Sequence, residues 1–378
     1  MQKIGVLGGG QLGKMLCQAA SINGIRLHIL EMDDSFPAAG VCPDITYGDF
    51  KNYDDVLSFG REMDVITVEI EAVNTRALHQ LVKEGKKVFP QPHLLDLIKD
   101  KGDQKTWYEK HGFSTSPFEL FDDASSARKS IGEGKWTLPV VQKSRRDGYD
   151  GQGVKVVRKI TDLDELIDGP CLLEKMADIN KEISVIVARN PSGDIESFPV
   201  VEMEFHPTAN LVEFLFSPSS IPMPKQQEAI EIAEKLANKL EIVGLLAVEF
   251  FLNKNGDIWV NEVAPRPHNS GHQTIEGNIT SQYAQHLRAI QDWPLGDTSA
   301  RSSSVMVNIL GANGHTGDAI YDGLDKCMEI SGASIHLYGK ATTKPFRKMG
   351  HATIIDDDIN EAIKKAKLLK QTLKVIAS

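Results

Sequence analysis

The sequence is poor in cysteine, has no long apolar run and carries no excess of positive charge. Its four cysteines are scattered with no Cys-x-x-Cys spacing, which argues against a zinc site or a disulfide framework and suits a reducing cytosol. No stretch reaches the roughly 18 consecutive apolar residues that a membrane-spanning helix needs. Glycines and Lys14 interrupt residues 1–14 too early for a secretory signal, so we expect a cytoplasmic protein with no membrane partner.

The formal net charge of −10 disfavours nonspecific binding to nucleic acid. An anionic substrate must therefore be bound by a local cluster of Lys and Arg. With 378 residues the chain is long enough for two or three domains.

Residues 1–98 have the pattern of a small α/β domain. A short strand at 3–7 leads into Gly8–Gly13, which fits G-x-G-x-x-G, and a second strand at 26–30 ends in Glu31. An acidic residue about 20 positions after the glycines completes the dinucleotide-binding fingerprint. Alone this match is weak, because the same glycines suit any tight strand-to-helix turn. A further buried strand at 65–70 ends in Glu71.

The stretch 243–272 predicts a β-hairpin followed by a polar loop. Two apolar runs flank Asn255-Gly256, which is a strong hairpin signal and brings Glu249 close to Asn261 and Glu262. Two carboxylates held together in apolar surroundings repel each other, and a hard divalent cation with oxygen ligands would relieve the repulsion. The ordinary alternative is that one glutamate faces solvent. The loop from Arg266 to His272 leaves the strand with the composition of a site loop.

A second candidate loop lies between two β-rich runs at 138–142 and 154–158. It contains Gly148, Gly151 and Gly153, whose backbone N–H groups can approach phosphate oxygens, and Lys143 precedes it. A polar hairpin with a flexible tip is the ordinary alternative. The charged helical region at 94–112 contains Lys101 and Lys105, which on composition alone we expect to be solvated.

These motifs together resemble the ATP-grasp ligases, and within them the 5-(carboxyamino)imidazole ribonucleotide synthases. The shared motifs are GGGQLG, GYDGQG, EKM, NEVAPRPHNSGH and RKMGH, in family order over nearly the whole chain. The resemblance implies an α/β and α+β fold: a Rossmann-like domain at 1–98, an ATP-grasp domain of two subdomains at 99–295 and a small β-rich domain at 296–378. Residues 143–154 would form the lid over the nucleotide. Asp147 departs from the pattern, since a glycine is expected there in many relatives.

The resemblance also assigns roles to residues. Magnesium, for which manganese can substitute, would lie on Glu249 and Glu262, and catalysis would involve Tyr149, Asp150, Arg266 and Lys340. ATP would be bound by Lys101, Lys143, Gly148, Tyr149, Asp150, Gly151, Gln152, Gly153, Val154, Glu174, Lys175, Met176, Ala177, Glu182, His206, Asn261 and Glu262. The acceptor would be bound by Gly10, Gln11, Leu12, Glu71, His268, Asn269, Ser270, Lys340, Arg347 and Lys348. Lys340, Arg347 and Lys348 belong to a basic cluster, which without the resemblance would read as a solvated surface run.

The implied reaction joins ATP and bicarbonate into carboxyphosphate, which carboxylates the amine of 5-aminoimidazole ribonucleotide in purine biosynthesis. Relatives form dimers, so we expect a homodimer. One alternative is another ATP-grasp ligase, such as the formate-dependent glycinamide ribonucleotide formyltransferase. A second is an NAD-dependent oxidoreductase built on Gly8–Gly13 and Glu31, which would leave the other motifs unexplained. A nucleotide sensor without catalysis is the third.

Overall fold

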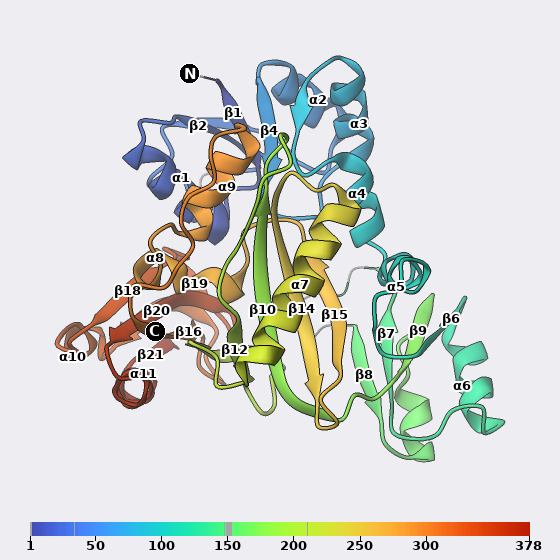
Figure 1. Cartoon of the computed structure of the whole chain (residues 1–378). Helices are drawn as coiled ribbons and strands as arrows, with labels where there is room; N and C mark the ends of the chain where they lie inside the picture. The colour runs from blue at the N-terminus through green and yellow to red at the C-terminus, as the bar shows by residue number, and fades with distance from the viewer. Residues whose placement is uncertain (1, 34, 147, 149–152, 210) are drawn as a thin grey trace.

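The computed structural model describes residues 2–33, 35–146, 148, 153–209 and 211–378. Its amino-terminal part is a parallel sheet in the order β3-β2-β1-β4-β5 (Figure 1). The strands are β1 (Ile4–Leu7), β2 (Leu27–Glu31), β3 (Asp44–Tyr47), β4 (Val65–Val68) and β5 (Lys87–Val88). Ile4, Val6 and Ile29 face one core, while Leu7, Leu30 and Ile66 face another. Both faces of the sheet are therefore covered, as in other doubly wound sheets.

Helices from two distant parts of the chain cover this sheet. The helix α1 (Gln11–Ile22) shares its core with α9 (Gln282–Ile290), while α2 (Tyr53–Arg61) and α3 (Thr75–Lys83) pack on the other face. The loop from Arg266 to His272 lies shortly before α9 in sequence. The packing of α9 against α1 therefore places this loop near Gly8–Gly13, which we call the glycine-rich turn.

The helical region predicted at 94–112 is two helices, α4 (Pro92–Ile98) and α5 (Lys101–Lys110). The break falls at Asp100, whose carboxylate accepts hydrogen bonds from the N–H groups of Gly102 and Asp103 and so caps α5. The guanidinium groups of Arg145 and Arg146 also bind this carboxylate, at 2.8 and 3.1 Å. These ion pairs connect the amino end of α5 to Arg145 and Arg146, which directly precede the glycine-rich segment between β7 and β8.

A small antiparallel sheet in the order β6-β9-β7-β8 lies beside α5 (Figure 1). It consists of β6 (Phe118–Phe121), β7 (Val140–Ser144), β8 (Val154–Val157) and β9 (Cys171–Lys175), with α6 (Ala124–Gly132) and η1 (Ile160–Glu165) packed on it. Lys143 pairs with Val154 across β7 and β8, so the glycine-rich segment joins two neighbouring strands as predicted. Asp147, Tyr149, Asp150, Gly151 and Gln152 lie outside the described residues.

The large antiparallel sheet runs β15-β14-β10-β12-β13-β16-β20-β18, and β11 adds to β10. Its strands are β10 (Ile179–Arg189), β11 (Ile195–Ser197), β12 (Val201–Phe205), β13 (Val212–Ser217), β14 (Gly244–Asn253), β15 (Ile258–Ala264), β16 (Ser303–Leu310), β18 (Ala333–Leu337) and β20 (Lys348–Asp356). The helix α7 (Met223–Leu240) packs Ala229, Ala233 and Leu236 against β10 and β14.

This sheet crosses the predicted boundary at residue 296. Phe214 of β13 pairs with Val307 of β16, so the strands of the predicted C-terminal domain continue the sheet of the preceding one. The chain then adds a small sheet in the order β19-β17-β21, formed by β17 (Gly317–Asp322), β19 (Thr342–Thr343) and β21 (Lys374–Ala377). The helices α10 (Leu324–Met328) and α11 (Ile359–Thr372) complete this end of the molecule.

Among the described residues, no helix combines the length and hydropathy required to cross a bilayer.

Candidate active site

The hairpin of β14 and β15 places the two predicted metal ligands opposite each other. Glu249 pairs with Glu262 in the strand register, and the next pair is Phe250 with Val260. Asn261 is therefore an extra residue in β15, which forms a β-bulge. The turn closes at Gly256, whose φ of 90° is a conformation that residues with a side chain rarely adopt.

Three lysines face this bulge, and we call Lys101, Lys105 and Lys143 the lysine row. Lys101 forms an ion pair with Glu262, and Lys143 donates a hydrogen bond to Asn261 at 3.0 Å. Glu174 of β9 lies between Lys105 and Lys143, with its carboxylate oxygens 2.9 Å from the Nζ of Lys105 and 2.8 Å from the Nζ of Lys143. The row and its partners line one small pocket between α5, β7, β9 and β15.

Composition alone predicted that Lys101 and Lys105 are solvated; neither is, and Lys105 departs most from this prediction. Its side chain is 3% exposed and its partner Glu174 is 2% exposed, so it is not a solvated surface lysine. Lys105 follows Lys101 by four residues and therefore shares its face of α5, and this face is covered by β9 and β15. The spacing was visible in the sequence, but the covering strands were not.

The charges of this pocket shift the pKa values of its groups in opposite directions. Burial and the neighbouring Glu262 carboxylate raise the pKa of Glu249, while the Lys101 ammonium lowers that of Glu262. Burial raises the pKa of Glu182 on β10 to about 7, and burial lowers the pKa of Lys105 to about 8.

The donor set at the bulge fits a hard cation. Glu249 and Glu262 offer carboxylate oxygens on facing strands, and the repulsion that raises the pKa of Glu249 would fall if a cation lay between them. The described residues contain no group of three or more His, Cys, Asp or Glu side chains that could hold a metal alone. Magnesium often binds through one or two carboxylates and completes its shell with phosphate and water.

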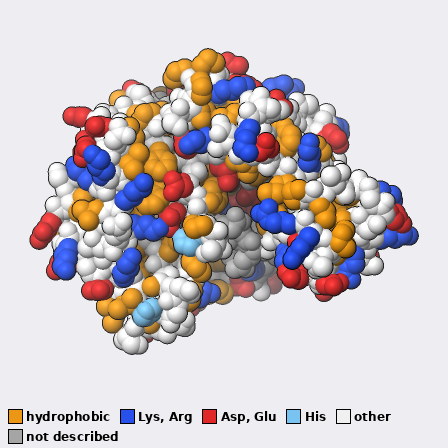
Figure 2. All heavy atoms as spheres, turned by 90° about the horizontal axis from the view of Figure 1, so that it is seen from below, with side chains coloured by type: hydrophobic (Ala, Val, Ile, Leu, Met, Phe, Trp, Pro, Cys, Tyr) orange, Lys and Arg blue, Asp and Glu red, His pale blue; other side chains and the backbone are white. Residues whose placement is uncertain are grey.

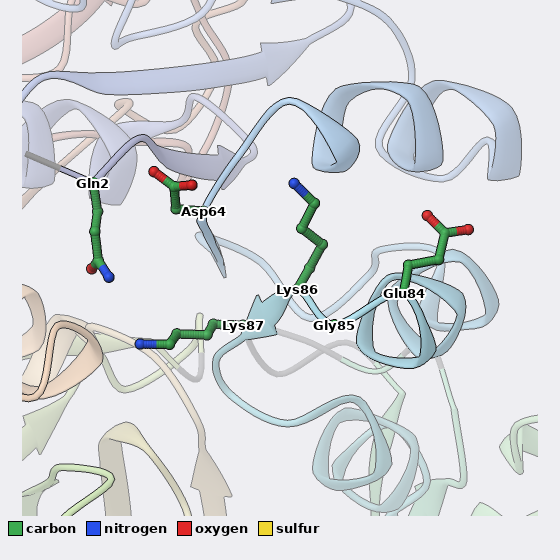
Figure 3. Close-up of a pocket in the computed structure, with 6 residues that line it drawn as sticks. All are labelled: Gln2, Asp64, Glu84, Gly85, Lys86 and Lys87. Atoms are coloured by element: carbon green, nitrogen blue, oxygen red, sulfur yellow. The ribbon is translucent and has the colours of Figure 1, made fainter.

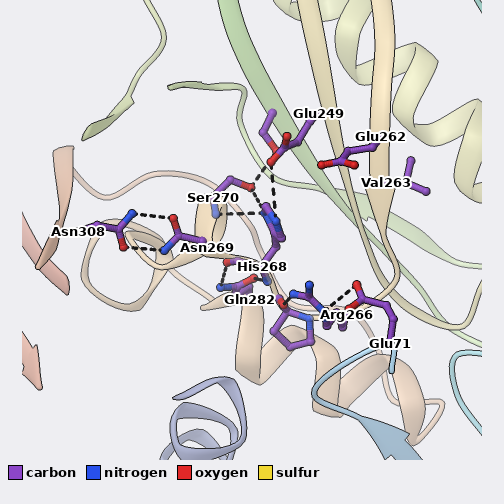
Figure 4. A network of polar contacts seen from close by, with 12 residues as sticks. Glu71, Glu249, Glu262, Val263, Arg266, His268, Asn269, Ser270, Gln282 and Asn308 are labelled. Atoms are coloured by element: carbon purple, nitrogen blue, oxygen red, sulfur yellow. Dashed lines mark hydrogen bonds and ion pairs between the residues drawn. The ribbon is translucent and has the colours of Figure 1, made fainter. Parts of the chain in front are cut away.

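The loop after β15 lies between the carboxylates and the amino-terminal sheet (Figure 4). Arg266 forms an ion pair with Glu71 at 2.8 Å, which joins this loop to the segment that follows β4. His268 lies 3.7 Å from Glu249 and its Nδ1 is 2.9 Å from the hydroxyl of Ser270. The structure therefore brings the predicted acceptor residues His268 and Ser270 close to the predicted metal ligand Glu249.

Asn269 has a structural partner in the C-terminal part of the sheet. Its side-chain amide exchanges two hydrogen bonds, at 3.0 and 2.8 Å, with that of Asn308 on β16 (Figure 4). Asn308 also donates to the carbonyl of Val212 on β13. This contact fixes η2 (Asn269–Gly271) over the large sheet.

The glycine-rich turn is closed by the protein's own carboxylates. The N–H of Gly9 donates to Glu31 at 2.8 Å, and the N–H of Gly10 donates to Glu69 at 2.6 Å. A methyl group at Gly10 would collide with the Glu69 carboxylate, which would have to shift from its hydrogen bond to the Gly10 N–H. A dinucleotide pyrophosphate would need these same N–H groups, and the oxidoreductase alternative therefore loses its main support. Gln11 and Leu12 begin α1 directly after this turn.

The predicted basic cluster lies on β20 and the segment before it. Lys340 donates to the carbonyl of Lys348 at 2.8 Å, and Arg347 donates to the carbonyl and hydroxyl of Thr342. His206 at the end of β12 contacts Glu213 at 3.8 Å and packs its ring edge-on against Phe346. Seen from below, the surface is hollowed near the middle, and basic and acidic side chains gather around the hollow (Figure 2).

The remaining predicted nucleotide residues lie at the end of β9, in β10 and between them, or beside the undescribed segment. Glu174 and Lys175 end β9, Met176 and Ala177 lead into β10, and Glu182 lies on β10. Gly148 and Gly153 lie on the two sides of the undescribed segment, and Val154 begins β8.

Another hollow lies away from these residues. It is lined by Gln2, Asp64, Glu84, Gly85, Lys86 and Lys87 (Figure 3). These residues lie at the amino ends of β1, β4 and β5. Ligands of doubly wound sheets bind at the carboxyl ends of the strands, so we do not assign the active site to this hollow.

Comparison with known families agrees with this geometry. The family model of the ATP-grasp domain matches residues 106–283, that of the ribonucleotide synthetase preATP-grasp domain matches 1–99, and that of the phosphoribosylaminoimidazole carboxylase C-terminal domain matches 304–365. The N5-carboxyaminoimidazole ribonucleotide synthase of Synechococcus elongatus is 36% identical over 360 residues, which cover 94% of this chain and 89% of that protein. The chain belongs to the N5-carboxyaminoimidazole ribonucleotide synthase family. The family and the ATP-grasp fold predicted from the sequence are therefore confirmed.

Solved structures of N5-carboxyaminoimidazole ribonucleotide synthases have the same fold. The enzyme of Thermotoga maritima aligns with a TM-score of 0.91 and 39% identity over all of both chains. That of Aspergillus clavatus, in complex with ADP and 5-aminoimidazole ribonucleotide, aligns with a TM-score of 0.90 and 32% identity over 98% of both chains. The chain also matches phosphoribosylaminoimidazole carboxylases, and it spans 64% of the length of the one from Vigna aconitifolia.

Sequence reasoning missed two carboxylate contacts and one lysine in this family member. Glu31 and Glu69 close the glycine-rich turn, and Lys105 joins the lysine row. Glu69 follows β4 directly, two residues before the predicted Glu71, and this position at a strand end was the signal that could have identified it.

Proposed function

We propose that the protein uses ATP to carboxylate the amine of 5-aminoimidazole ribonucleotide, giving N5-carboxyaminoimidazole ribonucleotide, ADP and phosphate. The observation that carries this proposal is the lysine row, which faces the paired carboxylates of the bulged hairpin beside Arg266. Cationic side chains can hold the phosphates of ATP, while the adjoining loop can hold an acceptor. The A. clavatus relative, solved with ADP and 5-aminoimidazole ribonucleotide, supports the same pairing of ligands.

In the first step an oxygen of bicarbonate attacks the γ-phosphorus of ATP, ADP leaves, and carboxyphosphate forms. Lys101 and Lys143 bind the phosphates and oppose the charge that grows during transfer. Magnesium, held by Glu249 and Glu262, would neutralise charge on the phosphate oxygens. Arg266 orients bicarbonate, because its planar guanidinium matches the paired oxygens of a carboxylate.

In the second step carboxyphosphate releases CO₂ and phosphate, and the amine nitrogen of the ribotide bonds to the carbon of CO₂. The nitrogen loses a proton in this step. We assign the proton to Asp150, with Tyr149 beside it, as predicted from the family motif; both lie outside the described residues. Lys340 would polarise the transferring carboxyl group, while Lys348 and Arg347 bind the ribotide phosphate.

Two groups of residues complete the assignment. The acceptor would be bordered by Gly10, Gln11, Leu12, Glu71, His268, Asn269 and Ser270. The nucleotide would be bordered by Glu174 to Ala177, Glu182 and His206. We further propose the domain division at 98 and 295, a homodimer in solution and a cytoplasmic location. Light scattering of the purified protein tests the dimer.

The decisive assay measures ADP release with magnesium, ATP and bicarbonate, with and without 5-aminoimidazole ribonucleotide. We expect strong stimulation by the ribotide and a carboxylated product by mass spectrometry. ATP hydrolysis that is indifferent to the ribotide would overturn the acceptor assignment. ADP release that depends on formate and glycinamide ribonucleotide instead would support the formyltransferase alternative.

A further inference from the structure

Lys105 is buried in the lysine row but reaches a carboxylate rather than the predicted phosphate site. Its ammonium binds Glu174 at 2.9 Å and donates a hydrogen bond to the hydroxyl of Thr115. Thr115 in turn donates to the carbonyl of Val260 on β15 at 2.7 Å. Lys105 therefore joins α5 to β9 and to the strand that carries the bulge.

Glu174 is shared between two ammonium groups. One of its oxygens binds Lys105 and the other binds Lys143, and its carboxylate is almost completely buried. The interaction with two cations lowers the pKa of Glu174 despite its burial, so it is ionised at neutral pH. A carboxylate bound to Lys143 alone would neutralise the charge that this lysine offers to a phosphate.

The charge count of the pocket depends on Lys105. The lysine row contributes three positive charges, and its bound partners Glu174 and Glu262 contribute two negative charges. The lysine row and its two bound carboxylates therefore have a net charge of +1 with Lys105 and of zero without it, and we call this net positive charge the surplus. Burial increases the effect of this one unit of charge on a bound phosphate, because charges interact more strongly where water is excluded.

We propose that Lys105 is a positioning residue for the nucleotide, which acts by compensating Glu174 so that Lys143 keeps its charge for the phosphates of ATP. This inference deepens the proposed function, since it concerns the same nucleotide site. Nothing in the predicted reaction requires Lys105 to touch ATP. Its effect passes through Glu174, and this distinguishes it from Lys101 and Lys143.

The same contacts predict that the KM for ATP depends on pH. Lys105 faces Glu174 of β9, Lys143 of β7 and Glu262 of β15, and burial lowers its pKa to about 8. Below that pH it is charged and the surplus is present, whereas above it the surplus disappears. The KM for ATP of the wild-type enzyme should therefore rise between pH 7 and pH 9.

The test compares Lys105→Met, Lys105→Arg and the control Lys110→Met, which removes an exposed lysine from the same helix. We expect Lys105→Met to raise the KM for ATP about tenfold, the equivalent of roughly 1.4 kcal/mol, with a much smaller change in kcat. Lys105→Arg keeps the charge, so its KM should rise less from pH 7 to pH 9 than that of the wild type. Lys110→Met should match the wild type throughout.

A double variant separates charge compensation from packing. Lys105→Met with Glu174→Gln removes one charge of each sign and restores the surplus, so its KM for ATP should fall below that of Lys105→Met alone. A KM for Lys105→Met within twofold of the wild type would overturn the proposal. If Lys105→Met does not fold, parallel pH profiles of Lys105→Arg and the wild type would overturn it instead.

ADP binding by calorimetry keeps this test independent of the acceptor. If the wild-type protein binds ADP but does not respond to the ribotide, the proposed function fails while the role of Lys105 can still be measured. We expect Lys105→Met to weaken ADP binding also, and unchanged binding would refute the inference.

Discussion

Replacing Glu262 by glutamine should separate nucleotide binding from turnover. The change removes one of the two negative charges bound by the lysine row and leaves the shape of the side chain almost intact. The net charge of the lysine row and its bound carboxylates then rises from +1 to +2, so binding of ADP without magnesium should not weaken. Turnover should fall, because the facing carboxylates no longer both contribute to the metal site.

The size of the loss follows from the kind of interaction removed. Deleting one group that stabilises charge in a transition state costs about 10²–10³ in rate, or roughly 2.7–4 kcal/mol. We therefore expect kcat/KM to fall by about that factor in the ADP-release assay, with a higher magnesium concentration needed for half-maximal rate. Glu231→Gln, an exposed change on α7, is the matched control. Turnover of Glu262→Gln within threefold of the wild type at equal magnesium would refute the metal assignment.

Three further predictions concern the acceptor, the glycine-rich turn and the nucleotide ribose. Arg347→Ala should raise the KM for the ribotide and leave that for ATP unchanged, and equal ribotide dependence in both enzymes would remove its phosphate role. Gly10→Ala should lower stability by about 1–3 kcal/mol in denaturant unfolding, because the new methyl group meets Glu69, and a stability equal to the wild type would contradict this contact. The pKa of Glu182 is raised to about 7, so this carboxyl group is neutral below pH 7 and ionised above it. If it accepts hydrogen bonds from the ribose hydroxyls, the KM for ATP should fall as the pH rises toward 7, and Glu182→Gln should abolish this fall.

The hairpin could be predicted from the sequence because its signals are local. Asn255-Gly256 between two apolar runs is sufficient to bring Glu249 and Glu262 together, and the register agrees. The environment of Lys105 could not be predicted in this way, since its burial depends on Glu174, which approaches from another sheet. The residue type alone does not show whether a lysine is exposed or buried. The only indication in the sequence was the four-residue spacing of Lys101 and Lys105, which places both on one face of a helix.

Long-range strand pairing also exceeded what the sequence could show. The family resemblance placed a domain boundary at residue 296, yet β13 and β16 on its two sides are hydrogen-bonded neighbours. Pairing of distant strands depends on side chains that pack across the sheet, and a single sequence gives little information about such partners. The motifs themselves predicted the family correctly without this information.

The bulge in β15 limits the insertions and deletions that this enzyme can tolerate. In a regular strand, neighbouring side chains point to opposite faces, so Asn261 and Glu262 could not both reach the lysines on one side. The extra residue makes both contacts possible: Asn261 binds Lys143 and Glu262 binds Lys101. Deleting a single residue at this point would restore a regular strand ladder but would turn one of the two side chains away from the lysines. Insertions and deletions here should therefore be far less tolerated than substitutions, even though the hairpin tip nearby could accept a longer turn.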